Sequence, residues 1–320
     1  MIRVVKIDIN DKIYGGRVYE NEMVKQLDGY VEFDRVFIMK HKLWVLNIMR
    51  FIGVWFHYKF FFKGVLLLTN ATTLFAGLFS TNIVIIHHID SHISLRPMRL
   101  YDYLCDKYLF LRAKTFDKIV VVASIWKELL AAKGLSNISI IYNSFDPDDF
   151  VFSPDDIQGF KAKYKLNEKP IVFLGNGIKG KGADVCYDIL KDMDAHFVTT
   201  GKMDFDIPVI HLTLNYSEYK LLLASSSVVL TMSEFNEGWN RVAHEASLCG
   251  TPVVGSGRGG MRELLEIAGQ TVSDFDHLKN NVLARLDKYD GPTERLKALN
   301  MDYFKKSWEQ VFKEFELSTN

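Results

Sequence analysis

Residues 233–263 read SEFNEGWNRVAHEASLCGTPVVGSGRGGMRE, and this segment decides the fold. Its middle is predicted to be a helix, since Gly238 and Asn240 can begin it and Gly250 with Pro252 can end it. A short apolar strand, PVVGS, and a glycine turn, GRGG, follow. Free N–H groups at the start of such a helix and in such a turn can bind phosphate. The segment therefore predicts a parallel α/β sheet with an anion site at its loops.

Two carboxylates lie in this segment, Glu237 at the predicted helix mouth and Glu245 eight residues later. Eight helical residues rise about 12 Å, roughly the length of a ribose, a diphosphate and the start of a sugar. Taken singly, each glutamate is an ordinary helix carboxylate. Together they indicate the two ends of an extended ligand.

The alternation of strand and helix extends over the whole chain. The expected strands are VVKIDI, VFIM, VLLL, IVII, KIVVVA and SIIY in the first half, then PIVFLG, HFVTTG, PVIHL, VVLTM and PVVGS. An acidic, proline-containing linker at 146–168 separates two α/β, Rossmann-like, doubly wound domains, 1–150 and 151–300. The tail, 301–320, is predicted to be an amphipathic helix. Its apolar face consists of Phe304, Trp308, Val311, Phe312 and Phe315.

Composition excludes several classes of protein. The 320 residues are 48% hydrophobic and 24% charged, which excludes disorder and is enough for two cores. The 39 basic and 39 acidic residues balance, unlike those of a dedicated nucleic-acid binder. The three cysteines lie far apart, which argues against a disulfide framework or a structural zinc site. With no secretory signal in MIRVVKIDIN, a cytoplasmic location is expected.

Two stretches raise the question of a membrane. Residues 64–86 carry no charge, yet their grouped Thr, Asn and Ser residues favour strand, helix and strand over a spanning helix. Residues 35–63 contain no acid and interleave cations with Trp44, Trp55 and several phenylalanines. One interpretation is peripheral contact with an anionic membrane. The other is an amphipathic helix with a solvated basic edge and an aromatic stripe facing the core.

The E-x7-E spacing before CGTPVVGS and GGMRE resembles the donor-binding signature of retaining GT-B glycosyltransferases of family 4. FLGNGIKGKGAD is similar to that family's G-R-x-x-x-x-K-G segment, and IIYNSFDPDDF to its bridge between domains. VVVASIWKELLAAKG, the strand end in NIVIIHHID and the pair Gly15-Gly16 also match, in order. The resemblance covers essentially the whole chain.

The resemblance implies two domains facing each other across a cleft. The first, 1–150, would bind the acceptor, the second, 151–300, the nucleotide sugar, and the helix 301–320 would cross back to the first. The implied reaction transfers a sugar, with retention, from a nucleotide diphosphate-sugar to a hydroxyl of a glycan or lipid-linked acceptor. No metal or other cofactor is expected. Asp204-Phe205-Asp206 spells a D-x-D motif but is predicted to be a solvated turn.

Site residues follow from the matched positions. Glu245 would bind the ribose hydroxyls, Glu237 a hydroxyl of the donor sugar, and Lys181 the leaving diphosphate. His88 would lie near the reacting sugar, with His87, on the other face of the strand, as the alternative. Further substrate contacts are implied for Gly15, Gly16, Gly175, Asn176, Lys179, Gly238, Trp239 and Asn240.

The sequence also departs from the family. Asn176 replaces the phosphate-binding arginine and Ser144 replaces a glycine of the bridge, so phosphate stabilisation depends more on Lys181 and Arg258. A catalytically degenerate nucleotide-sugar binding module is therefore the alternative function. A nicotinamide-dependent oxidoreductase shares the doubly wound fold, but the first turn lacks G-x-G-x-x-G.

Overall fold

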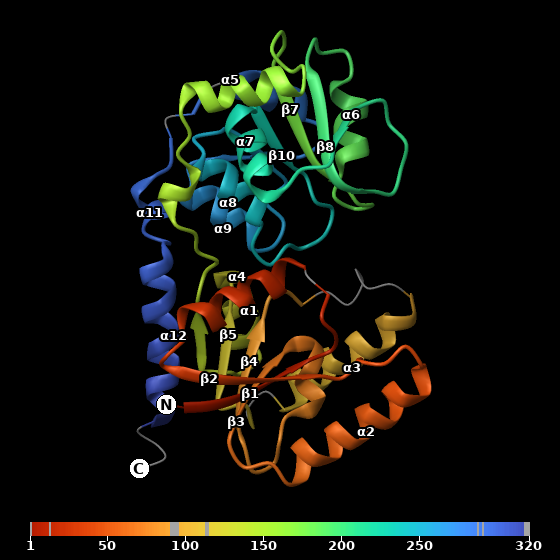
Figure 1. Ribbon diagram of the computed structural model, residues 1–320, viewed down its shortest axis with the longest axis vertical. Coiled ribbons are helices and arrows are strands. Elements are labelled where there is room, and N and C mark those ends of the chain that lie inside the picture. Colours follow the sequence, from red (N-terminus) through yellow and green to blue (C-terminus); the bar gives the residue numbers. More distant parts are fainter. Residues whose placement is uncertain are drawn as a thin grey trace. The chain divides into compact units, whose positions relative to one another are not determined.

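The computed structural model describes residues 2–12, 14–89, 96–112, 115–286, 288–289 and 291–316. The chain forms two compact units, unit 1 (Met1–Asn143 with Met301–Asn320) and unit 2 (Ser144–Asn300). Each contains a parallel sheet of six strands with helices on its faces (Figure 1). The division between the units falls a few residues before the expected boundary at 150/151.

Unit 1 has the strand order β2-β1-β3-β4-β5-β6. The strands are β1 (Ile2–Asp8), β2 (Val31–Phe37), β3 (Val65–Thr69), β4 (Thr81–Ile86), β5 (Lys118–Val121) and β6 (Ile138–Ile140). The central strands β3 and β4 are continuous buried apolar runs, as expected for a parallel sheet covered on both faces. The predicted alternation of strands with helices is confirmed in unit 1.

The uncharged stretch 64–86 is not one helix. Between β3 and β4 lies only the short 3-10 helix η1 (Asn70–Phe75), which a capping box between Thr69 and Thr72 begins. In the described ranges, no helix has the length and apolarity needed to cross a membrane.

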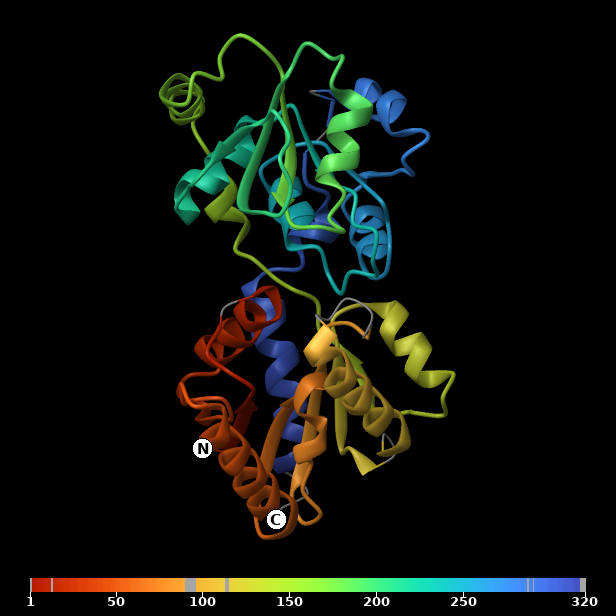
Figure 2. The same ribbon diagram turned by 90° about the vertical axis from the view of Figure 1, so that its right-hand side faces the viewer.

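The helices of unit 1 are α1 (Gly15–Gln26), α2 (Trp44–Phe60), α3 (Arg96–Arg112), α4 (Ser124–Ala131) and α12 (Met301–Glu316). The C-terminal helix α12 packs beside α1 and belongs to unit 1 (Figure 2). Its Phe304, Trp308 and Phe312 are buried, and the Phe304 ring meets Tyr19 of α1 edge-on, with 5.0 Å between the ring centroids. The apolar face predicted for the tail is therefore the face that packs.

Unit 2 has the strand order β12-β11-β10-β7-β8-β9. Its strands are β7 (Ile171–Gly177), β8 (His196–Met203), β9 (Ile210–Leu212), β10 (Val228–Thr231), β11 (Val253–Gly255) and β12 (Thr271–Val272). Its helices are η4 (Pro147–Phe150), α5 (Pro154–Lys163), α6 (Ala183–Leu190), α7 (Tyr216–Ser225), α8 (Arg241–Leu248), α9 (Met261–Ile267), α10 (Leu278–Arg285) and α11 (Glu294–Lys297). Of these strands, only β12 was not expected, because two residues give no readable alternation. The expected linker at 146–168 instead contains η4 and α5.

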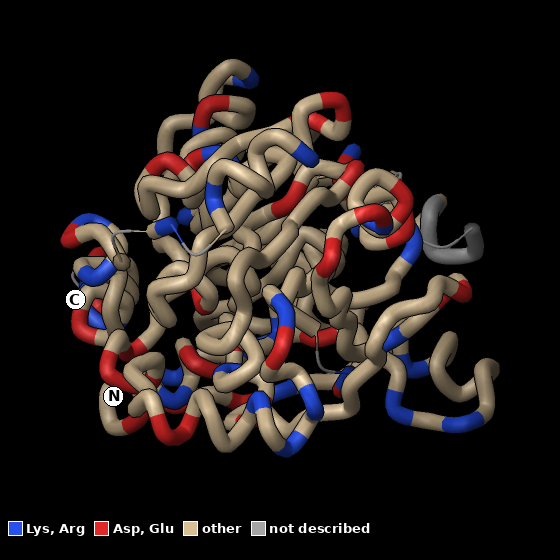
Figure 3. Tube along the Cα trace, turned by 90° about the horizontal axis from the view of Figure 1, so that it is seen from above, with Lys and Arg blue, Asp and Glu red and all other residues tan. Residues whose placement is uncertain are grey.

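Charged residues of both signs are scattered along the trace (Figure 3), in keeping with a formal net charge of +0. The chain order of the strands is more informative about ligands. In unit 2 the chain runs from β7 to β8 and β9 on one side, then returns to β10 on the other. In unit 1 the same reversal separates β1 from β3. Open α/β sheets bind ligands at such switch points, beyond the carboxyl ends of the strands.

Candidate functional site

At the switch point of unit 2, Lys181 and Glu237 form an ion pair. Lys181, after β7, places Nζ 2.5 Å from Oε1 of Glu237, which follows β10. Ser233 Oγ donates to the same oxygen at 2.5 Å, and the ammonium lies 4.7 Å from the centroid of the Phe235 ring. The side chains of Lys181 and Glu237 are 28% and 12% exposed. This pair is thus ordered by its neighbours and still within reach of a ligand.

The glycine turn after β11 holds the backbone of Glu237. Gly259 forms an isolated bridge with Glu237, and the Gly260 N–H donates to the Glu237 carbonyl at 2.9 Å. A Cβ on Gly259, whose φ is +67°, would lie 2.3 Å from that carbonyl oxygen. Arg258, which was expected to assist with phosphate, donates instead to the carbonyl of Glu234 at 2.7 Å. The turn therefore positions Glu237.

The two candidate lysines in the loop after β7 differ in their surroundings. Lys179 is exposed, whereas Lys181 contacts Glu237. Gly175 was expected at the end of the strand, but β7 continues to Gly177 with an irregular register. Asn176 pairs with Thr200 of β8 in that register. The irregularity arises where Gly175 adopts a φ of +79°.

Asp204 and Asp206 follow directly after β8 and are exposed. Hydrogen bonds from the Lys202 side chain and from the Lys179 backbone N–H hold the pKa of Asp204 below its usual range. Across the part of the chain that the structure describes, no group of three or more His, Cys, Asp or Glu side chains could hold a metal ion.

Glu237 does not belong to the helix that carries Glu245. Helix α8 begins only at Arg241, so the rise of about 12 Å estimated for eight helical residues does not apply. Asn240 is the N-cap, and its Oδ1 accepts from the Ala243 N–H at 2.9 Å. Gly238 and Trp239 are buried, and the indole Nε1 of Trp239 donates to His244 Nδ1 at 3.2 Å. The side chains of Trp239 and Asn240 thus hold the start of the helix.

Glu245 lies in the middle of α8 and is only 4% exposed. Its Oε1 accepts from the Tyr216 hydroxyl at 3.2 Å and lies 3.4 Å from Nη2 of Arg241. Burial raises the pKa of Glu245, although Arg241 and the hydroxyls of Tyr216 and Tyr219 favour its charged form. Sequence reasoning missed all three partners. The i,i+4 spacing could have identified Arg241, whereas the tyrosines come from another helix.

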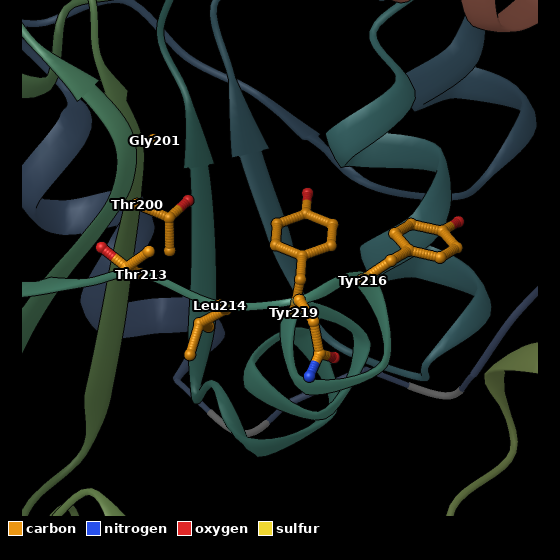
Figure 4. A pocket seen from close by; sticks show the side chains of 7 residues that line it. Thr200, Gly201, Thr213, Leu214, Tyr216 and Tyr219 are labelled. Carbon is orange, nitrogen blue, oxygen red and sulfur yellow. The ribbon is translucent and has the colours of Figure 1, made fainter.

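Figure 4 shows a pocket of about 420 Å³ whose lining includes Tyr216. The Tyr216 hydroxyl, which donates to Glu245, connects the pocket to that carboxylate. Its lining consists of Thr200, Gly201, Thr213, Leu214, Asn215, Tyr216 and Tyr219. The rings of Tyr216 and Tyr219 are stacked, with their centroids 6.2 Å apart. These residues come from β8 and from the segment that follows β9. The pocket and the Lys181–Glu237 pair therefore lie along the same carboxyl edge of the sheet.

In unit 1, the two glycines begin a helix rather than form a loop. Gly15 and Gly16 are the first residues of α1, and a Cβ on Gly16 would lie 2.8 Å from the ring of His87. Nε2 of His87 is 3.1 Å from Oε1 of Glu20. The carbonyl of His88 accepts from the Asn70 side chain at 3.3 Å. Of the two histidines, His87 is the one that packs against the glycine pair.

Beneath His87 lies a buried ionic cluster that sequence reasoning missed. Lys6, Asp8, Arg17 and Glu20 are each at most 3% exposed, and both cations contact both carboxylates. Burial alone would raise the pKa of Glu20, but the hydrogen bond from His87 and the charge of Lys6 outweigh it and hold that pKa at about 2. The sequence carried one signal of this cluster, the charged residues within an apolar strand and in the helix that follows it.

Comparison with known proteins gives a fold but no family by sequence. No protein-family profile matches the chain, and no curated protein matches it by sequence. Among solved structures, HepE of Anabaena in complex with UDP and glucose has a TM-score of 0.74 at 15% identity, covering 98% of this chain and 100% of HepE. Sucrose-phosphate synthase of Thermosynechococcus elongatus has a TM-score of 0.78 at 14% identity, covering 99% and 100%.

WaaG, a glycosyltransferase involved in lipopolysaccharide biosynthesis, has a TM-score of 0.63 at 12% identity, covering 95% of this chain and 94% of WaaG. These neighbours are GT-B proteins, and the two six-stranded parallel sheets with flanking helices agree with them. The chain therefore has a GT-B fold.

Proposed function

We propose, starting from this GT-B fold, that the chain is a retaining, metal-independent glycosyltransferase of family 4. It would transfer a sugar from a nucleotide diphosphate-sugar to an acceptor hydroxyl. The observation that carries the proposal is the buried Glu245 beside a pocket lined by Tyr216 and Tyr219. On the same sheet edge lies the Lys181–Glu237 pair.

The nucleoside would occupy the pocket and the space beside Glu245. A carboxylate can accept two hydrogen bonds from a ribose diol, and Glu245 is already fixed by Tyr216. A pocket of about 420 Å³ has room for a nucleobase next to Tyr219. HepE was solved with UDP and with UDP-glucose, which makes uridine nucleotides the first donors to test.

The diphosphate and the sugar would occupy the other end of the site. Lys181 would stabilise the negative charge that develops on the leaving diphosphate. Its move towards phosphate would release the carboxylate of Glu237 to accept from a sugar hydroxyl. Backbone groups of Gly175, Asn176, Lys179, Gly238, Trp239 and Asn240 complete the proposed donor contacts.

In the reaction, the bond between the anomeric carbon and the diphosphate oxygen breaks, and a bond from that carbon to the acceptor oxygen forms on the same face. The acceptor proton passes to the leaving diphosphate. The protein contributes positioning and electrostatic stabilisation, so the step needs no metal ion.

Unit 1 would bind the acceptor, which we propose is a glycan or lipid-linked hydroxyl at the cytoplasmic side of a membrane. Gly15 and Gly16 would lie close to the substrate. His88 remains the proposed histidine beside the reacting sugar. His87 is the alternative that the packing against Gly16 favours.

A thermal-shift experiment tests the donor site. UDP, GDP, ADP and their glucose conjugates are added to the wild type, Glu245→Ala and the exposed control Glu266→Ala, each with and without EDTA. Binding to the folded state raises Tm by mass action. We expect a rise with one nucleotide family that EDTA does not change. Glu245→Ala should weaken that binding about 10- to 100-fold, because it removes hydrogen bonds to a charged group.

If no nucleotide raises Tm, or if Glu245→Ala responds like Glu266→Ala, the donor site is misplaced. Where a nucleotide does bind, a turnover assay distinguishes an enzyme from a nucleotide-sugar binding module. The binding module is the alternative function that Asn176 favours, because its side chain carries no charge. A retaining enzyme should release UDP and, from a donor with an axial glycosidic bond, form a product whose glycosidic bond is also axial. NMR follows both changes. Binding without turnover over all acceptors tested would favour the module.

A further inference from the structure

The helix α2 has an apolar face on its solvent side. Its most exposed stripe follows the spacing i, i+3, i+4, i+7, which defines one face of a helix. That stripe consists of Val45, Ile48, Met49, Ile52, Phe56 and Phe60, which are between 37% and 66% exposed. A helix on the surface of a globular protein normally presents charged or polar residues there.

The opposite face of α2 fixes this orientation. The rings of Phe51 and Phe75 meet edge-on at 5.0 Å, and Trp55 Nε1 donates to the Leu74 carbonyl at 3.1 Å. Lys59 is also on the inner side, where its Nζ donates to the Ala76 carbonyl at 2.9 Å. The expectation of an aromatic stripe facing the core is therefore met, but a second apolar stripe faces outwards.

Neighbouring segments enlarge the exposed stripe. Leu43 and Trp44 are 67% and 70% exposed at the beginning of α2, and Phe61 is 62% exposed at its end. The Leu78 N–H donates to the Lys59 carbonyl at 2.9 Å, which places the exposed Leu78 and Phe79 beside that end. We call these five residues and the stripe the α2 surface. In both views, α2 lies at the outer side of unit 1 (Figures 1 and 2).

The charges at the two ends of the α2 surface have one sign. Lys40 and Lys42 are exposed before the helix and Lys63 after it, and residues 35–89 contain no acid. No acidic residue lies in the first turn of α2, where the helix dipole favours an anion. Two other cations of residues 35–63 point away from this surface, since Lys59 is 8% exposed and Arg50 donates to the Phe37 carbonyl.

We propose that the α2 surface binds the surface of an anionic lipid bilayer. The apolar stripe lies among the upper acyl chains, parallel to the membrane plane, and Lys40, Lys42 and Lys63 contact phosphate headgroups. An apolar band with cations at both ends matches the layering of such an interface. The contact uses no residue of the nucleotide pocket, so it does not depend on the proposed function.

Sedimentation with vesicles of phosphatidylcholine, with and without 30 mol% phosphatidylglycerol, tests this proposal. The wild type should bind the anionic vesicles at least about tenfold more tightly, and added salt should weaken that binding. Ile52→Ser with Phe56→Ser should lose at least about tenfold in affinity, because two apolar side chains return to water. Lys40→Gln with Lys42→Gln should lose roughly fivefold for each lysine.

Matched controls use exposed residues elsewhere. Leu283→Ser with Val151→Ser removes two exposed apolar side chains of unit 2, and Lys305→Gln with Lys306→Gln removes two exposed lysines of α12. Both should bind vesicles like the wild type. The near-UV circular dichroism of every variant should match that of the wild type, which shows that it is folded whatever its nucleotide binding.

The proposal is overturned if the wild type does not sediment with anionic vesicles, or if the α2 variants sediment like their controls. A concentration-dependent dimer that Ile52→Ser with Phe56→Ser converts to monomer, without vesicle binding, would assign the α2 surface to a second copy of the chain.

Discussion

At the scale of single residues, the buried carboxyl of Glu245 is the group through which the proposed nucleotide binding would depend on pH. Burial raises the pKa of this carboxyl, so it takes up a proton at a higher pH than an exposed glutamate does. The protonated form has lost its charge and part of its capacity to accept from a ribose diol. We predict that the affinity for the donor nucleotide sugar falls as the pH is lowered from 8 to 5.

Calorimetric titration with UDP-glucose checks this prediction, because its diphosphate, unlike the terminal phosphate of UDP, has no proton equilibrium near pH 6. Glu245→Gln should bind more weakly at pH 8 and show a nearly flat profile, whereas Glu266→Gln should follow the wild type. A profile of Glu245→Gln as steep as that of the wild type would assign the dependence to another group.

The two lysines after β7 provide a second comparison between residues. Lys181 contacts Glu237, whereas Lys179 is exposed. We predict that Lys181→Met lowers kcat by about 10²- to 10³-fold, the effect of removing one group that stabilises charge in a transition state. Lys179→Met, measured in the same steady-state assay, should lose less than about tenfold. Equal losses in both variants would mean that Lys181 has no special place at the diphosphate.

At the scale of helices and strands, hydrophobic periodicity predicts which side of an element packs when its apolar residues lie on one face. The tail has one apolar face, and that face packs in α12. The helix α2 has apolar residues on two faces, so its sequence left both interpretations open, and contacts such as that of Phe51 with Phe75 show which of the two faces packs inwards. The predicted start of the helix at Asn240 is confirmed, because Asn240 is the N-cap of α8, but the helical spacing between Glu237 and Glu245 is wrong, because Glu237 lies in a bridge with Gly259.

The candidate site was predictable to the extent that it is local in sequence. Glu237, Glu245 and Lys181 lie in short motifs, but the tyrosines beside Glu245 come from α7 and are brought there by helix packing. The ionic cluster of unit 1 likewise needs β1 and α1 to meet, and its contact with His87 also needs the segment that follows β4. Such contacts depend on tertiary structure, which a linear pattern does not contain.

At the scale of the whole molecule, each unit contains a buried group that titrates in its own pH range. His244 in unit 2 is fully buried, and burial lowers its pKa to about 3. In unit 1, the pKa of Glu20 is held at about 2. Acidification destabilises the folded state through both groups, because in each case the unfolded chain takes up the proton more readily than the folded one, but the two effects begin at different pH values. An unfolded histidine takes up its proton near pH 6.5, an unfolded glutamate only near pH 4.3.

We predict that acid weakens unit 2 before unit 1. Because burial depresses the folded pKa of His244, this residue does not affect stability above pH 6.5 and destabilises the folded state increasingly as the pH falls towards 3, by about 2 kcal/mol at pH 5. Glu245, whose pKa is raised, changes stability with pH in the opposite direction. It is therefore left unchanged in both proteins that are compared, the wild type and His244→Gln. Hydrogen exchange of peptides from each unit at pH 7.5, 6 and 5 should show falling protection in unit 2 alone. His244→Gln should flatten that fall, and an equal fall in both units would contradict the assignment to His244.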